Sequence, residues 1–117
     1  MREALAEYNN TYIEVEAKFG HYAWTHGHCN LCFENITLNG ELISDHVWIQ
    51  LREVKKKGYV DPKSYVKGGI YKIRAKVYVY RKLSKVTGEK TVEDFGFKRA
   101  KITPWEVVEW RKLLKWK

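Results

Sequence analysis

Residues 70–82, IYKIRAKVYVYRK, have the alternating pattern of a β-strand with two different faces. Successive side chains of a strand point to opposite sides, so this segment divides into an apolar set and a basic-aromatic set. The apolar set, which we expect to face a core, is Ile73, Ala75, Val77 and Val79. The basic-aromatic set, which we expect to face outward, is Lys72, Arg74, Lys76, Tyr78 and Tyr80.

The outward set combines the two chemistries that single-stranded nucleic acid requires. Cations neutralise phosphates, and aromatic rings stack on unpaired bases. The strand therefore predicts a nucleic-acid-binding face. A solvated outer face, in which lysines and tyrosines merely cover a sheet, explains the same pattern, and this strand alone does not choose between them.

Length and composition favour one globular domain over residues 1–117. The chain is 44% hydrophobic, which is enough for one modest core. It has no apolar run of membrane-spanning length, and its first residues, MREALAEYNN, lack the apolar stretch of a signal peptide. Only two cysteines, Cys29 and Cys32, are present, as suits a reducing compartment. We therefore expect a cytoplasmic protein without a membrane span.

The positive charge is concentrated in the second half of the chain. Residues 1–60 carry 6 Lys or Arg against 8 Asp or Glu, whereas residues 61–117 carry 16 against 6. A basic face built from the second half would attract a polyanion, and nucleic acid is the commonest one in a cell. An acidic partner protein or an anionic membrane surface would answer equally well.

Four more strands surround this segment in the sequence. The alternation of apolar residues predicts strands from Thr11 to near Gly20, about 28–38, 45–52 and about 92–102. A phase shift between Phe33 and Ile36 predicts a β-bulge, and Asn39-Gly40 predicts a turn. Residues 20–28, GHYAWTHGH, are expected to form a flexible loop or a strand distortion.

Helical structure is expected at the two ends of the chain. Residues 2–8 predict one short helical turn. Near the other end, Thr103-Pro104-Trp105-Glu106 has the pattern of a capping box with proline at the first helical position, so we expect an α-helix over about 103–116.

This order of elements resembles the oligonucleotide/oligosaccharide-binding (OB) fold. The residues that carry the resemblance are Asp45-His46-Val47-Trp48, the segment KGGIYKIRAKV and the final strand FGFKRAKI. The chain is similar to small OB-like proteins of phages and mobile elements of low-GC bacteria. The resemblance covers about residues 11–102 and implies an all-β, five-stranded Greek-key barrel, followed here by the C-terminal α-helix.

The resemblance also implies a binding surface. OB ligands usually lie across strands two and three, between the loops that join strands one to two and four to five. Transferred to this chain, that surface comprises Asn30, Trp48, Gln50, Arg52, Tyr22, Trp24, Lys82, Lys85 and Lys90. Trp24 and Trp48 are the stacking candidates. Trp48 has an alternative role, which is to fill the barrel mouth or to pack under the terminal helix.

Two glutamates oppose this interpretation. Glu14 and Glu16 lie on the outward face of the first strand and would repel phosphates. The fourth strand pairs with the first in some OB sheets, so the cations of strand four could simply pair with these glutamates. That alternative leaves Tyr78, Tyr80, Arg81 and Lys82 unexplained.

A metal site and an active site are both weakly supported. His26, His28, Cys29 and Cys32 include a C-x2-C spacing that suits zinc, but strand positions three apart face opposite ways. We therefore favour two reduced cysteines and no cofactor. Asp45 and His46 are adjacent on a strand and are expected to diverge, and no catalytic motif is present, so we expect a non-enzyme.

Together these patterns predict a non-catalytic protein that binds single-stranded DNA or RNA with low sequence specificity. The candidate phosphate contacts are Arg52, Lys72, Arg74, Lys76, Arg81, Lys82, Lys85 and Lys90, and the candidate stacking residues are Trp24, Trp48, Tyr78 and Tyr80. The alternative is a protein-interaction module, such as a phage-encoded inhibitor of a host nucleic-acid enzyme or defence complex. The basic, tryptophan-rich segment TPWEVVEWRKLLKWK motivates that alternative, with a host protein or nucleoprotein as partner.

Overall fold

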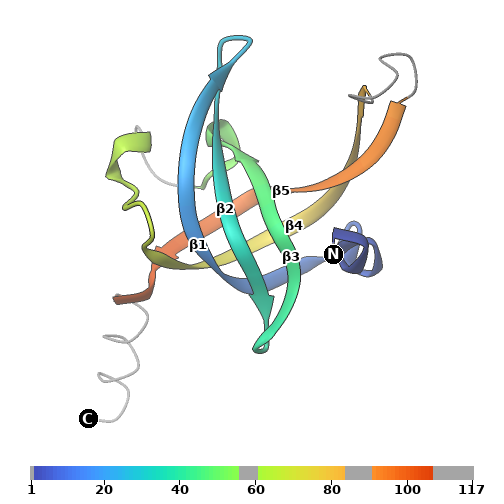
Figure 1. Cartoon of the computed structure of the whole chain (residues 1–117), viewed down its shortest axis with the longest axis horizontal. Helices are drawn as coiled ribbons and strands as arrows, with labels where there is room; N and C mark the ends of the chain where they lie inside the picture. Colours follow the sequence, from blue (N-terminus) through green and yellow to red (C-terminus); the bar gives the residue numbers. More distant parts are fainter. Residues whose placement is uncertain (1, 56–60, 84–90, 107–117) are drawn as a thin grey trace.

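Five strands close into one barrel in the computed structural model, which describes residues 2–55, 61–83 and 91–106 (Figure 1). The strands are β1 (Tyr12–Thr25), β2 (His28–Leu38), β3 (Glu41–Gln50), β4 (Ile70–Leu83) and β5 (Thr91–Pro104). Their order around the barrel is β1-β2-β3-β5-β4, and β4 closes it by pairing with β1. The β3–β5 contact is parallel, and the other pairs are antiparallel.

Tight two-residue turns join the first three strands. His26 and Gly27 connect β1 to β2 with φ values of 51° and 78°, and Asn39 and Gly40 connect β2 to β3 with 54° and 82°. Positive φ at both central residues matches the twist of a hairpin. The Asn39-Gly40 turn is thus confirmed. The flexible loop expected over 20–28 is wrong, because β1 continues to Thr25; the distortion there is a register shift between Phe19 and His21.

The predicted bulge in β2 is confirmed. Between the pairs Glu16–Thr37 and Lys18–Glu34, β2 contains one residue more than β1. Asn35 sits in this bulge with φ of 52°, and the extra residue returns Ile36 to the buried face. The bulge therefore reconciles the two phases of β2 and increases the local coiling that a closed barrel needs.

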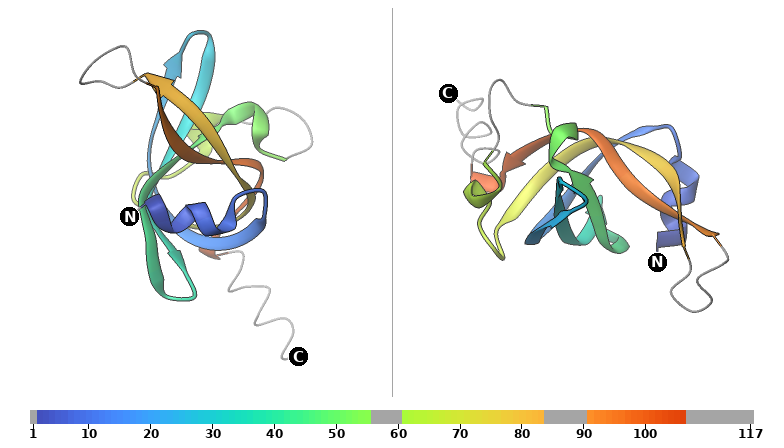
Figure 2. Two further views of the ribbon diagram at one scale, coloured as in Figure 1. Left: turned by 90° about the vertical axis from the view of Figure 1, so that its right-hand side faces the viewer. Right: turned by 90° about the horizontal axis from the view of Figure 1, so that it is seen from above.

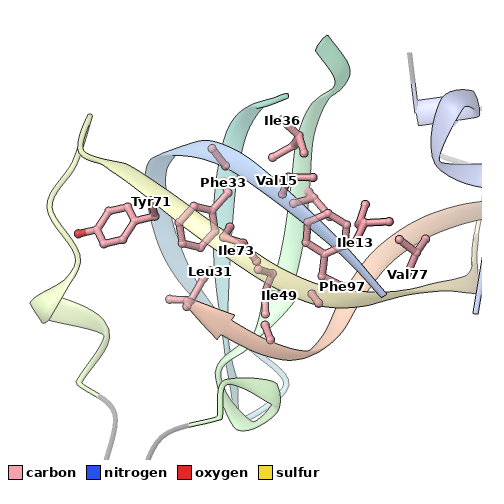
Figure 3. Close-up of a cluster of buried hydrophobic side chains, with 14 of the residues drawn as sticks. Ile13, Val15, Leu31, Phe33, Ile36, Ile49, Tyr71, Ile73, Val77 and Phe97 are labelled. Carbon is pink, nitrogen blue, oxygen red and sulfur yellow. The ribbon is translucent and has the colours of Figure 1, made fainter. Parts of the chain in front are cut away.

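The barrel interior is filled by the inward side chains of all five strands, several of which Figure 3 shows. Ile73, Ala75 and Val77 of β4 are buried as predicted. The inward placement of Val79 is wrong, because its side chain is 39% exposed. β1 accompanies β4 only as far as Tyr12–Lys76, after which Val77 bonds to the backbone of Asn10 and Thr11. Beyond this point β4 pairs with β5 alone, so the far end of the ribbon projects from the barrel (Figure 1).

Different segments cover the two ends of the barrel. At one end the short 3-10 helix η1 (Arg2–Tyr8) inserts Leu5, which is fully buried; Figure 2 shows η1 lying across this end. This confirms the helical turn expected at residues 2–8. At the other end Tyr65 stacks on Phe19 with ring centroids 5.4 Å apart. Tyr65 follows η3 (Pro62–Ser64), a single turn that the carboxylate of Asp61 caps.

Two predicted boundaries need correction. The third strand spans Glu41–Gln50 and gives way to the 3-10 turn η2 (Leu51–Glu53), so residues 51 and 52 are not part of it. β5 extends to Pro104, where Thr103 pairs with Lys72, so Thr103 is a strand residue and not a helix cap. Residues 107–116 of the expected C-terminal helix lie outside the described part of the chain. Within the described ranges, no helix has the length and apolar character to cross a membrane.

Candidate functional site

An open groove of about 370 Å³ lies on the outer surface of the barrel, a size within the range of small ligand sites. Its lining comes from the end of β1, from β2 and β3, and from the second half of β4. The lining residues are Thr25, Asn30, Trp48, Gln50, Tyr78 and Tyr80. In Figure 1 the β1–β2 hairpin and the β4–β5 ribbon both project from the barrel. The structure thus brings together three of the predicted stacking residues, Trp48, Tyr78 and Tyr80. Trp48 and Tyr80 are 32 positions apart in the sequence.

Gly96 leaves the space that the ring of Tyr78 occupies. β5 runs between β3 and β4, and Gly96 of β5 is the cross-strand partner of Tyr78. A Cβ atom at Gly96 would be 3.1 Å from the ring, which is tighter than ordinary packing allows. The missing side chain therefore lets the ring cross β5. Lys98, two residues further on, places its Nζ 5.5 Å from the ring centroid, a cation–π arrangement.

The environment of Tyr78 agrees with this placement. Burial raises the pKa of its phenol, and the carboxylate of Glu53 acts in the same direction while Arg52 opposes it. Glu53 and Arg52 belong to η2, directly after β3. The phenol therefore reaches toward the β3 side of the groove and is neutral at physiological pH.

Tyr80 is held beside Tyr78 by a buried carboxylate. The two ring centroids are 5.7 Å apart at 39°. The Tyr80 hydroxyl donates to Oδ2 of Asp94 at 3.3 Å, and Oδ1 of Asp94 accepts from the backbone N–H of Phe95. Asp94 is also the cross-strand partner of Tyr80. A ring anchored in this way loses little further freedom when a ligand stacks on it.

Trp48 forms the opposite wall over a cysteine. His21, Cys32 and Trp48 are neighbours across β1, β2 and β3, and the His21 and Trp48 rings meet edge to face with centroids 5.4 Å apart. The two rings thus close over Cys32, which is only 4% exposed. Burial, together with the nearby Glu34 and Asp45, raises the pKa of Cys32 to about 11. The half-buried Trp48 is on the outer surface and does not fill the barrel mouth.

Polar groups occupy the floor between the aromatic walls. Asn30 pairs in register with Gln50, and both line the groove. The Nε of Arg52 donates to Oε1 of Gln50 at 2.6 Å. This contact holds Arg52 at the groove edge and leaves the Gln50 amide nitrogen free to act as a donor. The predicted phosphate contact at Arg52 thus lies beside the rings.

Trp24, a predicted stacking residue, does not line the groove, because consecutive residues of a strand face opposite sides and its neighbour Thr25 is the one that faces the groove. Trp24 is 63% exposed and precedes Thr25, the groove residue at the end of β1. The predicted exposure of this ring is confirmed, although a strand and not a loop presents it.

The three cations of the first half of β4 lie elsewhere. Opposite them on β1 are Tyr12, Glu14 and Glu16. Lys72 forms an ion pair with Glu14, and Arg74 lies over the Tyr12 ring, 5.8 Å from its centroid. The structure therefore places Lys72 and Arg74 beside β1 and away from the groove rings, whereas Lys76 lies outside the groove lining but is the outward residue of β4 next to Tyr78.

The remaining predicted phosphate contacts fall at the edge of what the structure describes. Arg81 and Lys82 belong to β4 by their backbone, where Arg81 pairs with Glu93 and Lys82 with Val92. Lys85 and Lys90 lie outside the described residues.

The structure also describes the residues of the weakly supported metal site and the Asp45–His46 pair. Cys29 and Cys32 are free, buried thiols on one strand, and no cluster of three or more His, Cys, Asp or Glu suited to a metal ion occurs within residues 2–55, 61–83 and 91–106. The expected divergence of Asp45 and His46 is wrong: Oδ1 of Asp45 lies 3.2 Å from Nδ1 of His46 and also accepts the His46 backbone N–H. This is an interaction between the exposed Asp45 and the half-buried His46, outside the groove.

Sequence patterns missed three contributors to this surface. Gly96, Lys98 and Thr25 were not among the predicted site residues. The one available signal was the glycine between two phenylalanines in Phe95-Gly96-Phe97, because a glycine inside a strand often marks close approach of another group. Comparisons with protein-family models, with curated proteins and with solved structures find no match to this chain.

Proposed function

We propose that this protein is an OB-type barrel that binds single-stranded nucleic acid in the groove lined by Trp48, Tyr78 and Tyr80. The strand order β1-β2-β3-β5-β4, closed by β1 and β4, supports the OB assignment. The groove lies over β2 and β3 between the β1–β2 and β4–β5 hairpins, which is where OB barrels bind oligonucleotides.

The observation that carries the proposal is the grouping of aromatic rings with cations at their edges. Trp48 and the Tyr78–Tyr80 pair form two walls, and Lys98 and Arg52 lie beside them. Unpaired bases stack on such rings with roughly 1–3 kcal/mol per base. The cations then neutralise the phosphates that follow the bases.

Low sequence specificity follows from the balance of contacts. Stacking on a ring accepts every base, since every base has a π-face. Asn30 and Gln50 are the amide side chains of the groove lining and add a modest base preference. A duplex, whose bases are already stacked and paired, cannot use the rings in this way.

Fluorescence anisotropy with labelled oligo-dT and a matched duplex tests the proposal. We expect tight binding of the single strand, weak binding of the duplex, and a linear fall of log K with log salt of about 0.7 per phosphate contacted. Absence of single-strand binding at low salt contradicts the proposal. A protein partner that co-purifies at fixed stoichiometry and survives nuclease treatment would then favour an interaction module.

A further inference from the structure

A second group of cations surrounds Tyr12, outside the groove lining. We call the set Lys55, Arg74, Lys76 and Arg99, with the phenol they surround, the Tyr12 cluster. Tyr12 is the cross-strand partner of Lys76, and Arg74 lies over its ring. Arg99 comes from β5, and Lys55 is tied to β5 by its backbone N–H, which donates to Ala100 at 2.7 Å. Three chain segments thus bring positive charge to the Tyr12 phenol of β1.

A β-bulge in β5 directs Arg99 into this cluster. Between the pairs Arg74–Lys101 and Lys76–Lys98, β5 contains one residue more than β4. Arg99 is in this bulge with φ of 50°, a left-handed conformation that is uncommon for arginine. Bulges re-aim side chains, and here the exposed Arg99 side chain hydrogen-bonds the Tyr12 phenol.

The charges of the cluster are less compensated than those beside them. Glu14 forms its ion pair with Lys72, whereas the neighbouring Arg74 lies over an aromatic ring. Glu53 reaches the cluster, but its Oε2 accepts the backbone N–H of Arg99 at 3.1 Å. The hydrogen bond from Arg99 lowers the pKa of Tyr12; desolvation opposes this effect, and the charges of Lys55, Arg99 and Lys76 add to it.

Lys98 connects the cluster to the groove. It lies over the Tyr78 ring, and it is also the cross-strand partner of Lys76. Tyr78 and Lys76 are two residues apart on the same face of β4, a spacing of about 6.6 Å along a strand. The row Tyr78, Lys98, Lys76 and Tyr12 is therefore continuous across the outer surface.

We propose that the Tyr12 cluster is a second phosphate-binding site, which holds the backbone of a nucleic-acid strand where it leaves the groove past Lys98. This inference rests on the proposed function, because the groove supplies the strand. The ligand chemistry is a phosphodiester that bridges the Arg74, Lys76, Lys55 and Arg99 side chains. The bases of the nucleotides bound at the Tyr12 cluster do not have to stack on an aromatic ring, so this contact is independent of nucleotide sequence.

A paired variant, Lys55→Gln with Arg99→Asn, removes two charges and keeps the backbone, since asparagine tolerates the left-handed conformation. OB site sizes begin at about 4 nucleotides, so we compare oligo-dT of about 4 and about 12 nucleotides. The variant is expected to bind the short strand within about twofold of the original protein. It is expected to bind the long strand about 10-fold more weakly, with a salt slope shallower by about 1.4, or 0.7 for each of two lost contacts.

Two matched variants separate the possible outcomes. Lys72→Ala removes a neighbouring cation that Glu14 already compensates, and it is expected to change neither strand's affinity. Glu53→Gln keeps an acceptor for the Arg99 N–H and is expected to strengthen long-strand binding two- to threefold. If the paired variant binds both strands normally while Tyr78→Ala weakens both, the cluster proposal is overturned and the groove stands.

If the proposed function of the groove is wrong, the result is different, because the original protein then binds neither the short nor the long oligo-dT. An NMR titration with tripolyphosphate, observed at the ring resonances of Tyr12, then tests the phosphate site of the Tyr12 cluster without the groove. If the Tyr12 resonances shift in the original protein and do not shift in the paired variant, the phosphate site at the Tyr12 cluster is supported. No shift overturns it.

Discussion

The two halves of β4 share one outward pattern but have different neighbours and form different surfaces. Over residues 70–76 the strand lies beside β1, and its lysine at position 72 is compensated by Glu14. From residue 77 onward β1 has ended, and Tyr78 and Tyr80 border a groove shared with β3. The comparison teaches that alternation assigns a side chain to the outside of a barrel, whereas the adjacent strand decides what it does there.

The largest effect is expected from removing a groove ring. Tyr78→Ala should weaken single-strand binding about 10- to 100-fold, because a stacked ring contributes roughly 1–3 kcal/mol. Tyr78→Phe keeps the ring and is the matched control. Lys72→Ala, in the other half of β4, should change the affinity by less than twofold. Equal losses from Tyr78→Ala and Lys72→Ala, measured by anisotropy, would erase the distinction between the halves.

A second prediction concerns the thiol beneath the other groove wall. Trp48→Ala should speed alkylation of Cys32 about 10-fold or more at mildly alkaline pH. Burial is the main reason that the pKa of this thiol is raised to about 11, and removing the covering ring lowers the pKa and increases the thiolate fraction. Mass spectrometry of iodoacetamide-treated protein over time gives the rate. The equally buried Cys29 serves as internal reference, and parallel acceleration of both would indicate unfolding instead.

Adding a side chain at Gly96, beneath the Tyr78 ring, should weaken single-strand binding about 5- to 10-fold. Gly96→Val places atoms where a Cβ already comes within 3.1 Å of the ring, so Tyr78 must leave its position across β5. Thermal melting verifies that the variant folds. The same change in a Tyr78→Ala background should cost much less, and a double-mutant cycle measures this coupling. Full additivity would show that the ring position does not matter.

The smallest expected effect separates two lysines of similar exposure. Lys98→Ala should weaken binding about threefold and make the salt slope shallower by about 0.7, because one phosphate contact is lost. Lys72→Ala should leave the slope unchanged and reduce stability by less than about 1 kcal/mol, as is usual for an exposed ion pair. Denaturant unfolding and salt titrations of both variants provide the two readouts.

Local patterns predicted the parts of this fold that local chemistry determines. The alternation over Ile73–Val77, the phase shift at Asn35 and the Asn39-Gly40 turn each depend on a few adjacent residues, and each is confirmed. The outward placement of Trp48 and Gln50 followed from the same alternation.

The features that were missed depend on residues distant in sequence. Whether Val79 is covered depends on where β1 begins, and nothing in β4 encodes that position. Leu5 and Tyr65 occupy the barrel ends only because the barrel is already closed. The role of Gly96 requires the β4–β5 register that places it under Tyr78, and the bulge at Arg99 interrupts the alternation of β5 without a glycine to reveal it.

The most direct test of the account is photo-crosslinking with an oligo-dT that carries 5-iododeoxyuridine, which reacts with aromatic rings stacked on it. Tandem mass spectrometry then locates the adducts. The account predicts adducts at Trp48, Tyr78 or Tyr80, none at Tyr71 under the barrel end, and loss of these groove adducts on adding excess unlabelled oligo-dT. Adducts confined to residues 70–76, or crosslinks to the groove that a duplex forms equally well, would contradict it.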